Sequence, residues 1–386
     1  MPQGPANRGL QGLGRLPAAP DRVIGLPSVG GYRGHVMTSA WRNGFLLACL
    51  AVAPLAAGAE PTKLRITTQL PIKSPLGVNL TQFKNEVESK SGRAIVFEVY
   101  DSSSPQMIKD DEVLRSVSSG AIEIGVVTAP QFHDTVRAME VIEHPFFFNF
   151  EALVRAATDP DGETRGMLDT AIRETTGVRV LFWQAFGSSV FFAKGHDAKT
   201  PASIHGKRIR VAGENMASFI RYCGGVPFVM LASKQKQAID DGTIDMTISG
   251  ITTVKARELW KSTDTITRSE HAAFEFIVII NEKVWQTIPR EHQAIITAAA
   301  RKAERDLRQE TADIEAQAYA FARSKGMKIV ELTPDDVAEW RACSANLVDD
   351  YMETAGELGA RVMAAYGRLR TDPCCTSGPK GEFTKH

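Results

Sequence analysis

The stretch Gly206-Lys-Arg-Ile-Arg-Val211 opens a series of alternating strands and helices. Over Arg208–Val211 it alternates basic and apolar residues, which predicts a short strand. Downstream of it, the pattern predicts a helix over Ala217–Tyr222, an apolar run over Pro227–Leu231, a helix over Gln235–Asp240 and a strand over Ile244–Ile248. Because strands that alternate with helices form parallel sheets, this part of the chain is predicted to be an α/β lobe.

A second series of the same kind stands nearer the N-terminus. The sequence predicts strands over Lys63–Gln69, Ala94–Tyr100 and Ile122–Thr128, separated by a helix that begins after Pro71 and a helix over Asp110–Ser118. The third strand is almost continuously apolar, as expected for a strand that is covered on both faces. The predicted fold class is therefore α/β with two lobes.

Two further apolar segments are expected to connect the lobes. Val178–Trp183 is typical of a buried strand, and a new series opens after Gly187 with Val190–Ala193, so we predict a lobe boundary there. The apolar segment Glu275–Ile280 predicts a strand that returns to the first lobe. More than one crossover between two lobes makes a hinge.

The segment Arg290–Lys325 contains neither Pro nor Gly and carries apolar residues at helical spacing. It predicts one helix, about 50 Å long if unbroken, and the alternative is two helices joined without a visible break. Met327–Leu332 then predicts a short strand, and Thr333 is placed to cap a helix that continues through Trp340.

These patterns set the predicted domain boundaries. Residues 60–187, with a return segment 277–320, form the first lobe. Residues 188–276, with a C-terminal segment 321–370, form the second. Residues 371–386 are polar with Gly and Pro and are predicted to be a mobile tail.

Composition excludes several classes of protein. The chain has 386 residues of which 43% are hydrophobic, enough for a sizeable core. Its 45 basic and 45 acidic side chains cancel, so no global field would attract nucleic acid or an anionic membrane. A charged ligand must therefore be met by local groups.

The N-terminal region predicts export. Residues 1–36 are rich in Gly, Pro and Arg and are interpreted as disordered or as an over-extended gene start, with Met37 as the better start. The apolar stretch Gly44–Ala57 and the small-residue box Ala57-Gly58-Ala59 make residues 37–59 typical of a cleaved signal peptide. The protein is then expected in the periplasm, with no membrane insertion after cleavage.

The apolar stretch has two alternative interpretations. A transmembrane anchor would need ~20 apolar residues, and Pro54 interrupts the stretch. A lipoprotein site at Leu47-Ala48-Cys49 would have only a few apolar residues before the cysteine.

The remaining cysteines are Cys223, Cys343, Cys374 and Cys375. None has the spacing of a zinc site, so no metal is expected. In an oxidising compartment the adjacent pair Cys374-Cys375 could bond to Cys343 or to another chain. Free thiols in the tail are an equally good interpretation.

Motifs of catalysis are missing from the sequence. It contains no phosphate loop, no nucleophile elbow and no zinc-protease motif, and its eight histidines are scattered. No catalytic residues and no cofactor are therefore predicted, and the chain is interpreted as a non-enzyme.

The opening strand holds the candidate for ligand binding. Strand ends in α/β lobes face the ligand crevice, and an arginine there offers two parallel N–H donors to a carboxylate. Alternation puts Arg208 and Arg210 on one face and Lys207 on the other, so the pattern does not choose between the arginines. The alternative is that these residues are solvated charges at the strand edge.

Further stretches accompany the opening strand in a fixed order. They are Leu64-Arg-Ile-Thr-Thr68, Gly120-Ala-Ile-Glu-Ile-Gly125, Gly224-Gly-Val-Pro-Phe-Val-Met230 and Ala238-Ile-Asp-Asp-Gly-Thr-Ile-Asp245. With the signal peptide, this order resembles the DctP-type solute receptors of tripartite ATP-independent periplasmic (TRAP) transporters, over nearly all of residues 63–366. The resemblance implies a two-lobed solute-binding fold with hinge crossovers and a long helix that packs across both lobes.

The resemblance also implies a ligand site. The arginine of the Ile-Arg-Val strand, here Arg210, would pair with the carboxylate of the ligand. Other positions of the pocket would be Gln69, Thr128, Phe186, Val190, Ser249 and Phe274. Phe186 and Phe274 could equally be core aromatics, and Ser249 could only make a turn with Gly250.

Two departures from the family narrow the expected ligand. Sialic-acid receptors carry a second pocket arginine where Val190 stands, and many members have an asparagine where this chain has Ser249. With the apolar stretch Phe182–Phe192 around it, the pocket is expected to hold one charged anchor between apolar walls. It would suit a monocarboxylate, a keto or hydroxy acid, or an aromatic acid.

The family's role implies a partner and leaves alternatives. A DctP-type receptor would close around its acid and deliver it to integral-membrane TRAP permease subunits, with no nucleic acid involved. The alternatives are a receptor for an ATP-driven importer, a receptor that serves a membrane sensor, and an exported enzyme that uses Asp245 or Glu275 as a base.

Overall fold

The computed structural model describes residues 60–147 and 151–372, and the predicted signal peptide and tail cysteines lie outside these ranges. Its strands form a sheet of ten in the order β2-β1-β3-β9-β4-β7-β5-β6, with β8 on β4 and β10 on β8. The strands are β1 (Thr62–Thr67), β2 (Ile95–Tyr100), β3 (Ile124–Thr128), β4 (Val178–Ala193), β5 (Arg208–Val211), β6 (Val226–Val229), β7 (Met246–Gly250), β8 (Thr265–Arg268), β9 (Ala273–Asn281) and β10 (Lys328–Glu331).

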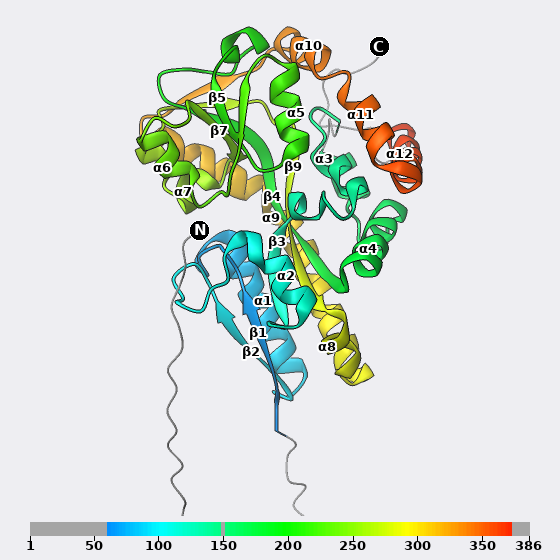
Figure 1. Ribbon diagram of the computed structural model, residues 1–386. Coiled ribbons are helices and arrows are strands. Elements are labelled where there is room, and N and C mark those ends of the chain that lie inside the picture. The colour runs from blue at the N-terminus through cyan, green and yellow to red at the C-terminus, as the bar shows by residue number, and fades with distance from the viewer. Residues whose placement is uncertain (1–59, 148–150, 373–386) are drawn as a thin grey trace, which may run out of the picture. The chain divides into compact units, whose positions relative to one another are not determined.

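The helices cover this sheet (Figure 1). They are α1 (Pro75–Lys90), α2 (Val113–Ser119), α3 (Glu151–Ala157), α4 (Glu163–Thr176), α5 (Glu214–Tyr222), α6 (Gln235–Asp240), α7 (Thr253–Ala256), α8 (Glu282–Thr287), α9 (Arg290–Ser324), α10 (Pro334–Cys343), α11 (Leu347–Thr354) and α12 (Gly356–Thr371). Short 3-10 helices are η1 (Asp110–Glu112), η2 (Ala129–Phe132), η3 (Arg137–Glu143), η4 (Pro201–Ile204) and η5 (Leu259–Lys261).

The two parallel series predicted from sequence are confirmed. In the first, β1 pairs in parallel with β2 and β3. In the second, β5 pairs in parallel with β6 and β7. Local signals explain α1 well: Ser74 caps it by accepting from the backbone N–H of Gly77 at 3.2 Å, Pro75 follows at its start, and Leu80, Phe83 and Val87 face the core.

The long antiparallel strands β4 and β9 join the two series (Figure 1). The sequence predicted two separate strands around Gly187, and this is corrected: β4 is one strand of 16 residues. The register shifts between Ala185 and Gly187, which is a β-bulge, and Gly187 has φ +92°. Glycine tolerates that conformation without strain, so the chain passes through the bulge as a strand.

The segment after Arg290 is a single helix, as predicted. Helix α9 contains 35 residues and contacts α1 and β4 in the first part of the fold and α7 in the second. Its last residue is Ser324, Lys325 is the C-cap, and the next residue, Gly326, has φ +78°. Its buried face is made largely of alanines, which let the helix approach the sheet closely. The helix thus packs on both lobes.

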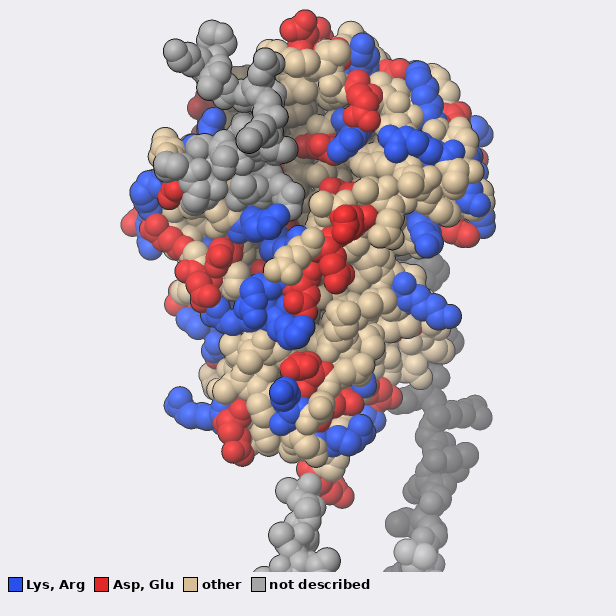
Figure 2. Space-filling view, turned by 180° about the vertical axis from the view of Figure 1, so that it is seen from behind, with Lys and Arg blue, Asp and Glu red and all other residues tan. Residues whose placement is uncertain are grey.

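Surface charge is mixed in sign, as the net charge of zero suggests. Figure 2 shows one face, on which Lys and Arg lie interspersed with Asp and Glu. Many charged side chains of the described residues form ion pairs, such as Lys63–Glu98 and Arg208–Asp245. This face therefore offers no large patch of one sign that would attract a polyanion.

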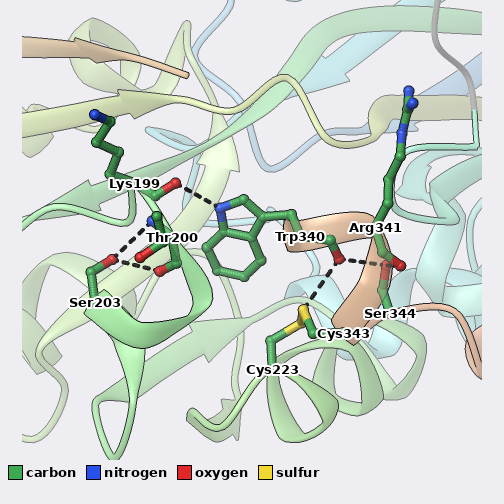
Figure 3. Close-up of a disulfide and its surroundings, with 8 residues drawn as sticks. All are labelled: Lys199, Thr200, Ser203, Cys223, Trp340, Arg341, Cys343 and Ser344. Atoms are coloured by element: carbon green, nitrogen blue, oxygen red, sulfur yellow. Dashed lines mark hydrogen bonds between the residues drawn. A yellow bond between two sulfur atoms is a disulfide. The ribbon is translucent and has the colours of Figure 1, made fainter. Parts of the chain in front are cut away.

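A disulfide joins Cys223 to Cys343, and Figure 3 shows its surroundings. Of the alternatives left open by the sequence, a bond between Cys343 and a tail cysteine is therefore wrong, and the partner is Cys223. Cys223 directly follows helix α5 and Cys343 is the last residue of helix α10, and the two Cα atoms lie 5.1 Å apart, within the range that a disulfide needs. Beside the bond, the buried indole of Trp340 donates to the backbone carbonyl of Lys199 at 3.0 Å.

Replacing both bonded cysteines with alanine is expected to lower the free energy of unfolding by about 2–4 kcal/mol. The bond closes a loop of sequence separation 120, so its removal frees a long segment of the unfolded chain. Urea unfolding of the oxidised variant and of the oxidised wild type would measure the difference. Equal unfolding midpoints would contradict this prediction.

Candidate functional site

Arg210 lies in the middle of the second parallel series, on β5. The strand pairs it with Phe228 of β6 and Thr247 of β7, so its backbone is fixed on both sides. Its side chain is 2% exposed. Nε donates to the carbonyl of Met230 and Nη1 donates to the carbonyl of Ile248, each at 2.9 Å. Two backbone carbonyls thus orient the guanidinium.

The charge of Arg210 is not matched by a carboxylate. Among the described residues, none makes an ion pair with it within 4.0 Å, and no hydrogen bond involves its Nη2. Burial and the charge of Arg257 lower the pKa of Arg210 to about 9, while Asp110 and Glu143 oppose that change. The guanidinium therefore stays charged near neutral pH, and an added carboxylate would stabilise it.

Arg208, on the same strand, is different. Its guanidinium donates to Asp245 at 2.7 Å and 3.1 Å, and its side chain is 42% exposed. The alternation that put both arginines on one face did not separate them. Their surroundings distinguish the two arginines, because Arg208 is the partly exposed first residue of β5 and is paired with Asp245.

A second polar group combines residues from both series. Gln69 follows β1, Asp110 begins η1, and Arg257 follows α7. With its amide nitrogen toward Asp110, Gln69 donates to both carboxylate oxygens, at 3.0 Å to Oδ1. In the opposite orientation its oxygen would accept from Arg257 at only 3.4 Å, so the first orientation is favoured.

This group is electrostatically coupled to Arg210. Burial raises the pKa of Asp110, and the charges of Arg257 and Arg210 act against that increase. Burial lowers the pKa of Arg257, and Asp110 opposes the change. The coupling places Gln69, the predicted site residue, in the same charged cluster as Arg210.

The other predicted residues lie around the crossing of β4, β7 and β9. Val190 on β4 pairs with Ser249 on β7, next to the carbonyl of Ile248 that holds Arg210. Ser249 shares a hydrogen bond of 2.8 Å with Thr253. The rings of Phe186 and Phe274 are 5.7 Å apart.

Each of these apolar residues also has core neighbours. Phe186 and Phe274 contact Phe276, and all three are nearly buried. Thr128 ends β3, where it pairs with Phe276 and is partly exposed. The structure thus places Val190 and Ser249 next to the strand position whose carbonyl orients Arg210, and Phe186 lies against Gly250 of the same strand. Phe274 contacts Phe186, and Thr128 lies one strand away, on the far side of β9.

Sequence reasoning missed three charged residues of the cluster: Asp110, Glu143 and Arg257. None of them belongs to a motif, and they act on Arg210 only because the fold brings them near it. One charged anchor was expected, whereas the cluster contains two arginines, Arg210 and Arg257. The signal that could have suggested Arg257 is its place shortly after β7, where strand ends carry ligand contacts.

Two further findings bear on what the site can do. Over residues 60–147 and 151–372, no group of three or more His, Cys, Asp or Glu side chains is placed to hold a metal ion. In the same ranges no helix combines the length and apolar character that crossing a membrane requires.

Known proteins share this fold. A Bordetella pertussis extracytoplasmic solute receptor, DctP7, whose structure is described as binding pyroglutamic acid, superposes with a TM-score of 0.74 at 22% identity, over 79% of this chain and 99% of that one. A TRAP solute-binding protein of Sulfurospirillum deleyianum, solved with succinate, gives 0.72 at 21% identity, over 79% and 99%.

Sequence relatives agree with the fold. The C4-dicarboxylate-binding periplasmic protein DctP of Rhodobacter capsulatus is 25% identical over 80% of this chain and 90% of its own length. The model of "Bacterial extracellular solute-binding protein, family 7", named DctP, matches residues 66–355. The resemblance predicted from the sequence is confirmed, and the chain belongs to the DctP family of bacterial extracellular solute-binding proteins.

Proposed function

We propose that this protein captures a small organic acid through Arg210 and presents it to the membrane permease subunits of a TRAP transporter. The observation that carries the proposal is a buried guanidinium that is held by backbone carbonyls and has no carboxylate partner among the described residues. An unpaired buried charge is costly, so such a group is retained where a ligand neutralises it.

The arrangement of the cluster supports capture by closure. Gln69 and Asp110 come from the first series, and Arg210 and Arg257 come from the second. An acid bound to Arg210 would contact groups of both, so its binding favours the closed form of the two lobes. Apolar walls from Phe186 and Phe274 would exclude water and strengthen the ion pair.

The enzyme alternative has little support from its named bases. Asp245 is paired with Arg208, and Glu275 accepts two hydrogen bonds from Arg308, at 3.0 Å and 3.2 Å. Both carboxylates already have structural partners. The relatives found are solute-binding proteins, which agrees with a receptor.

A panel of small acids tests the proposal. The panel comprises monocarboxylates, hydroxy and keto acids, dicarboxylates, aromatic acids and sugar acids, with neutral sugars as the control. A ligand at ~100 times its dissociation constant adds about 2.7 kcal/mol to the free energy of unfolding, so thermal unfolding should shift upward by several degrees for one class of acid. Stabilisation only by neutral sugars would overturn the proposal.

A further inference from the structure

Two buried polar side chains near Arg210 lack partners. His133 and Glu143 are 4% and 5% exposed. Three of their atoms have no hydrogen-bond partner among the described residues: Nδ1 and Nε2 of His133, and Oε1 of Glu143. The two side chains face one another, with Nε2 of His133 at 3.9 Å from Oε2 of Glu143. Leaving such groups unsatisfied costs about 1–3 kcal/mol each, so their retention calls for a reason.

His133 lies at the end of the strand that carries Arg210. It directly follows η2, and its Nδ1 is 3.7 Å from the point that a Cβ on Gly213 would occupy. Gly213 is the N-cap residue that directly precedes α5, and it stands three positions after Arg210. The imidazole therefore borders the turn that connects the arginine strand to its helix.

Glu143 lies on a segment that is hydrogen-bonded to α5. It ends η3, and Asn215 of α5 donates to the carbonyl of Glu140 in η3 at 3.2 Å. Glu143 and Arg210 are close enough that each acts on the titration of the other. The pair His133–Glu143 is thus a fixed neighbour of the arginine.

The two side chains are uncharged near neutral pH. Burial raises the pKa of Glu143 to about 8, with a contribution from Glu275 and against the pull of Arg210. Burial lowers the pKa of His133 to about 3. The pair then offers a carboxyl O–H donor, one imidazole N–H donor and acceptor atoms on both side chains.

The charges of the cluster limit what the ligand can carry. Arg210 and Arg257 contribute two positive charges. Burial raises the pKa of Asp110, but both of its oxygens accept from the amide of Gln69, as those of an ionised carboxylate do, so Asp110 is counted as one negative charge. One ligand carboxylate balances the remainder, whereas a dicarboxylate would add a buried negative charge and a zwitterion would leave a positive one.

We propose that His133 and Glu143 form a second subsite that hydrogen-bonds an uncharged polar group of the ligand, so that the preferred ligand is a monocarboxylate bearing a hydroxyl or a lactam amide. This inference rests on the proposed function, because it assumes that Arg210 takes the carboxylate.

Three acids with one ring size test the subsite. Cyclopentanecarboxylate has no polar group on its ring, pyroglutamate adds a lactam amide, and proline replaces the amide with an ammonium group. Butyrate and 2-hydroxybutyrate form a second, open-chain pair. By isothermal titration, the polar but uncharged member of at least one set should bind about tenfold more tightly than its apolar analogue and than proline, since one or two buried hydrogen bonds are gained.

Variants of Glu143 separate the subsite from the arginine. Glu143→Leu should remove most of that preference, because leucine can neither donate to nor accept from the polar group of the ligand. Glu143→Gln keeps a neutral hydrogen-bonding group and should retain most of the preference. Thermal unfolding of each variant without acid reports whether it is folded.

The outcomes distinguish the two proposals. Three results would overturn the subsite and leave capture by Arg210 intact. They are equal affinity for polar and apolar acids in both sets, tightest binding of proline or succinate, and a preference that survives Glu143→Leu. The proposed function and the subsite would both be overturned if Arg210→Gln bound every acid with the affinity of the wild type. They would also be overturned if the wild type bound none of the acids.

Discussion

Arg210→Gln is expected to weaken binding of the preferred acid by roughly 10² to 10⁴-fold. The guanidinium can form two charge-assisted hydrogen bonds to a carboxylate, each worth about 1.5–3 kcal/mol, and glutamine offers neither the charge nor the fork. Isothermal titration with the acid found in the panel would measure the change. Arg210→Lys should also bind weakly, because an ammonium group lacks the two parallel donors.

The same strand provides a matched control. Arg208→Gln removes an equal charge two residues away, from a side chain that is paired with Asp245 and is 42% exposed. Its affinity for the acid should stay within about twofold of the wild type, since exposed pairs contribute little. If both variants lost affinity equally, a general effect of charge would explain the data and the specific role of Arg210 would be wrong.

Glu304→Leu is expected to lower the free energy of unfolding by about 3–5 kcal/mol. Glu304 lies on α9, is 1% exposed, and accepts from Arg165 Nη1 at 2.8 Å and from the backbone N–H of Trp183 at 3.1 Å. Arg308 contacts the same carboxylate at 3.5 Å. Leucine would leave the backbone N–H of Trp183 without an acceptor. It would also remove a carboxylate that pairs with the buried side chains of Arg165 and Arg308.

The helix itself offers the control for this prediction. Lys302 is also on α9, but its side chain is 56% exposed and pairs with Asp306 on the surface. Lys302→Gln should change the free energy of unfolding by no more than about 0.5 kcal/mol. Urea unfolding would compare both variants with the wild type, and a loss below 1 kcal/mol for Glu304→Leu would show that the network around α9 is dispensable.

The network explains why the long helix matters to the whole molecule. Arg165 on α4 bonds Asp169 at 2.7 Å as well as Glu304, and its guanidinium stacks over the ring of Trp183 on β4 at 4.4 Å. Helices α4 and α9 and strand β4 are thereby tied at one buried point.

Regular elements with strong local signals were predicted well. Strand β5 and helix α6 have the predicted bounds, and α9 ends one residue before the prediction. Periodicity and the placement of Pro and Gly are properties of a short window, so they can be read without the rest of the chain. The continuous β4 was missed because its bulge at Gly187 looks locally like a turn.

The candidate site was predicted only in part. Family resemblance selected Arg210, whereas alternation alone could not choose between it and Arg208. The carboxylates Asp110 and Glu143 and the cation Arg257 were missed, since nothing in their own segments marks them. The partner of Cys343 was missed for the same reason, because Cys223 is 120 residues away along the chain.

The two α/β series, the long helix and the family could thus be predicted from the sequence, since they depend on residues that are neighbours along the chain. The three-dimensional structure was needed to show which arginine is buried without a carboxylate, which residues surround it and which cysteines bond. Burial and electrostatic coupling are set by distances in space, and in this protein those distances are fixed by the crossing strands β4 and β9 rather than by any single segment.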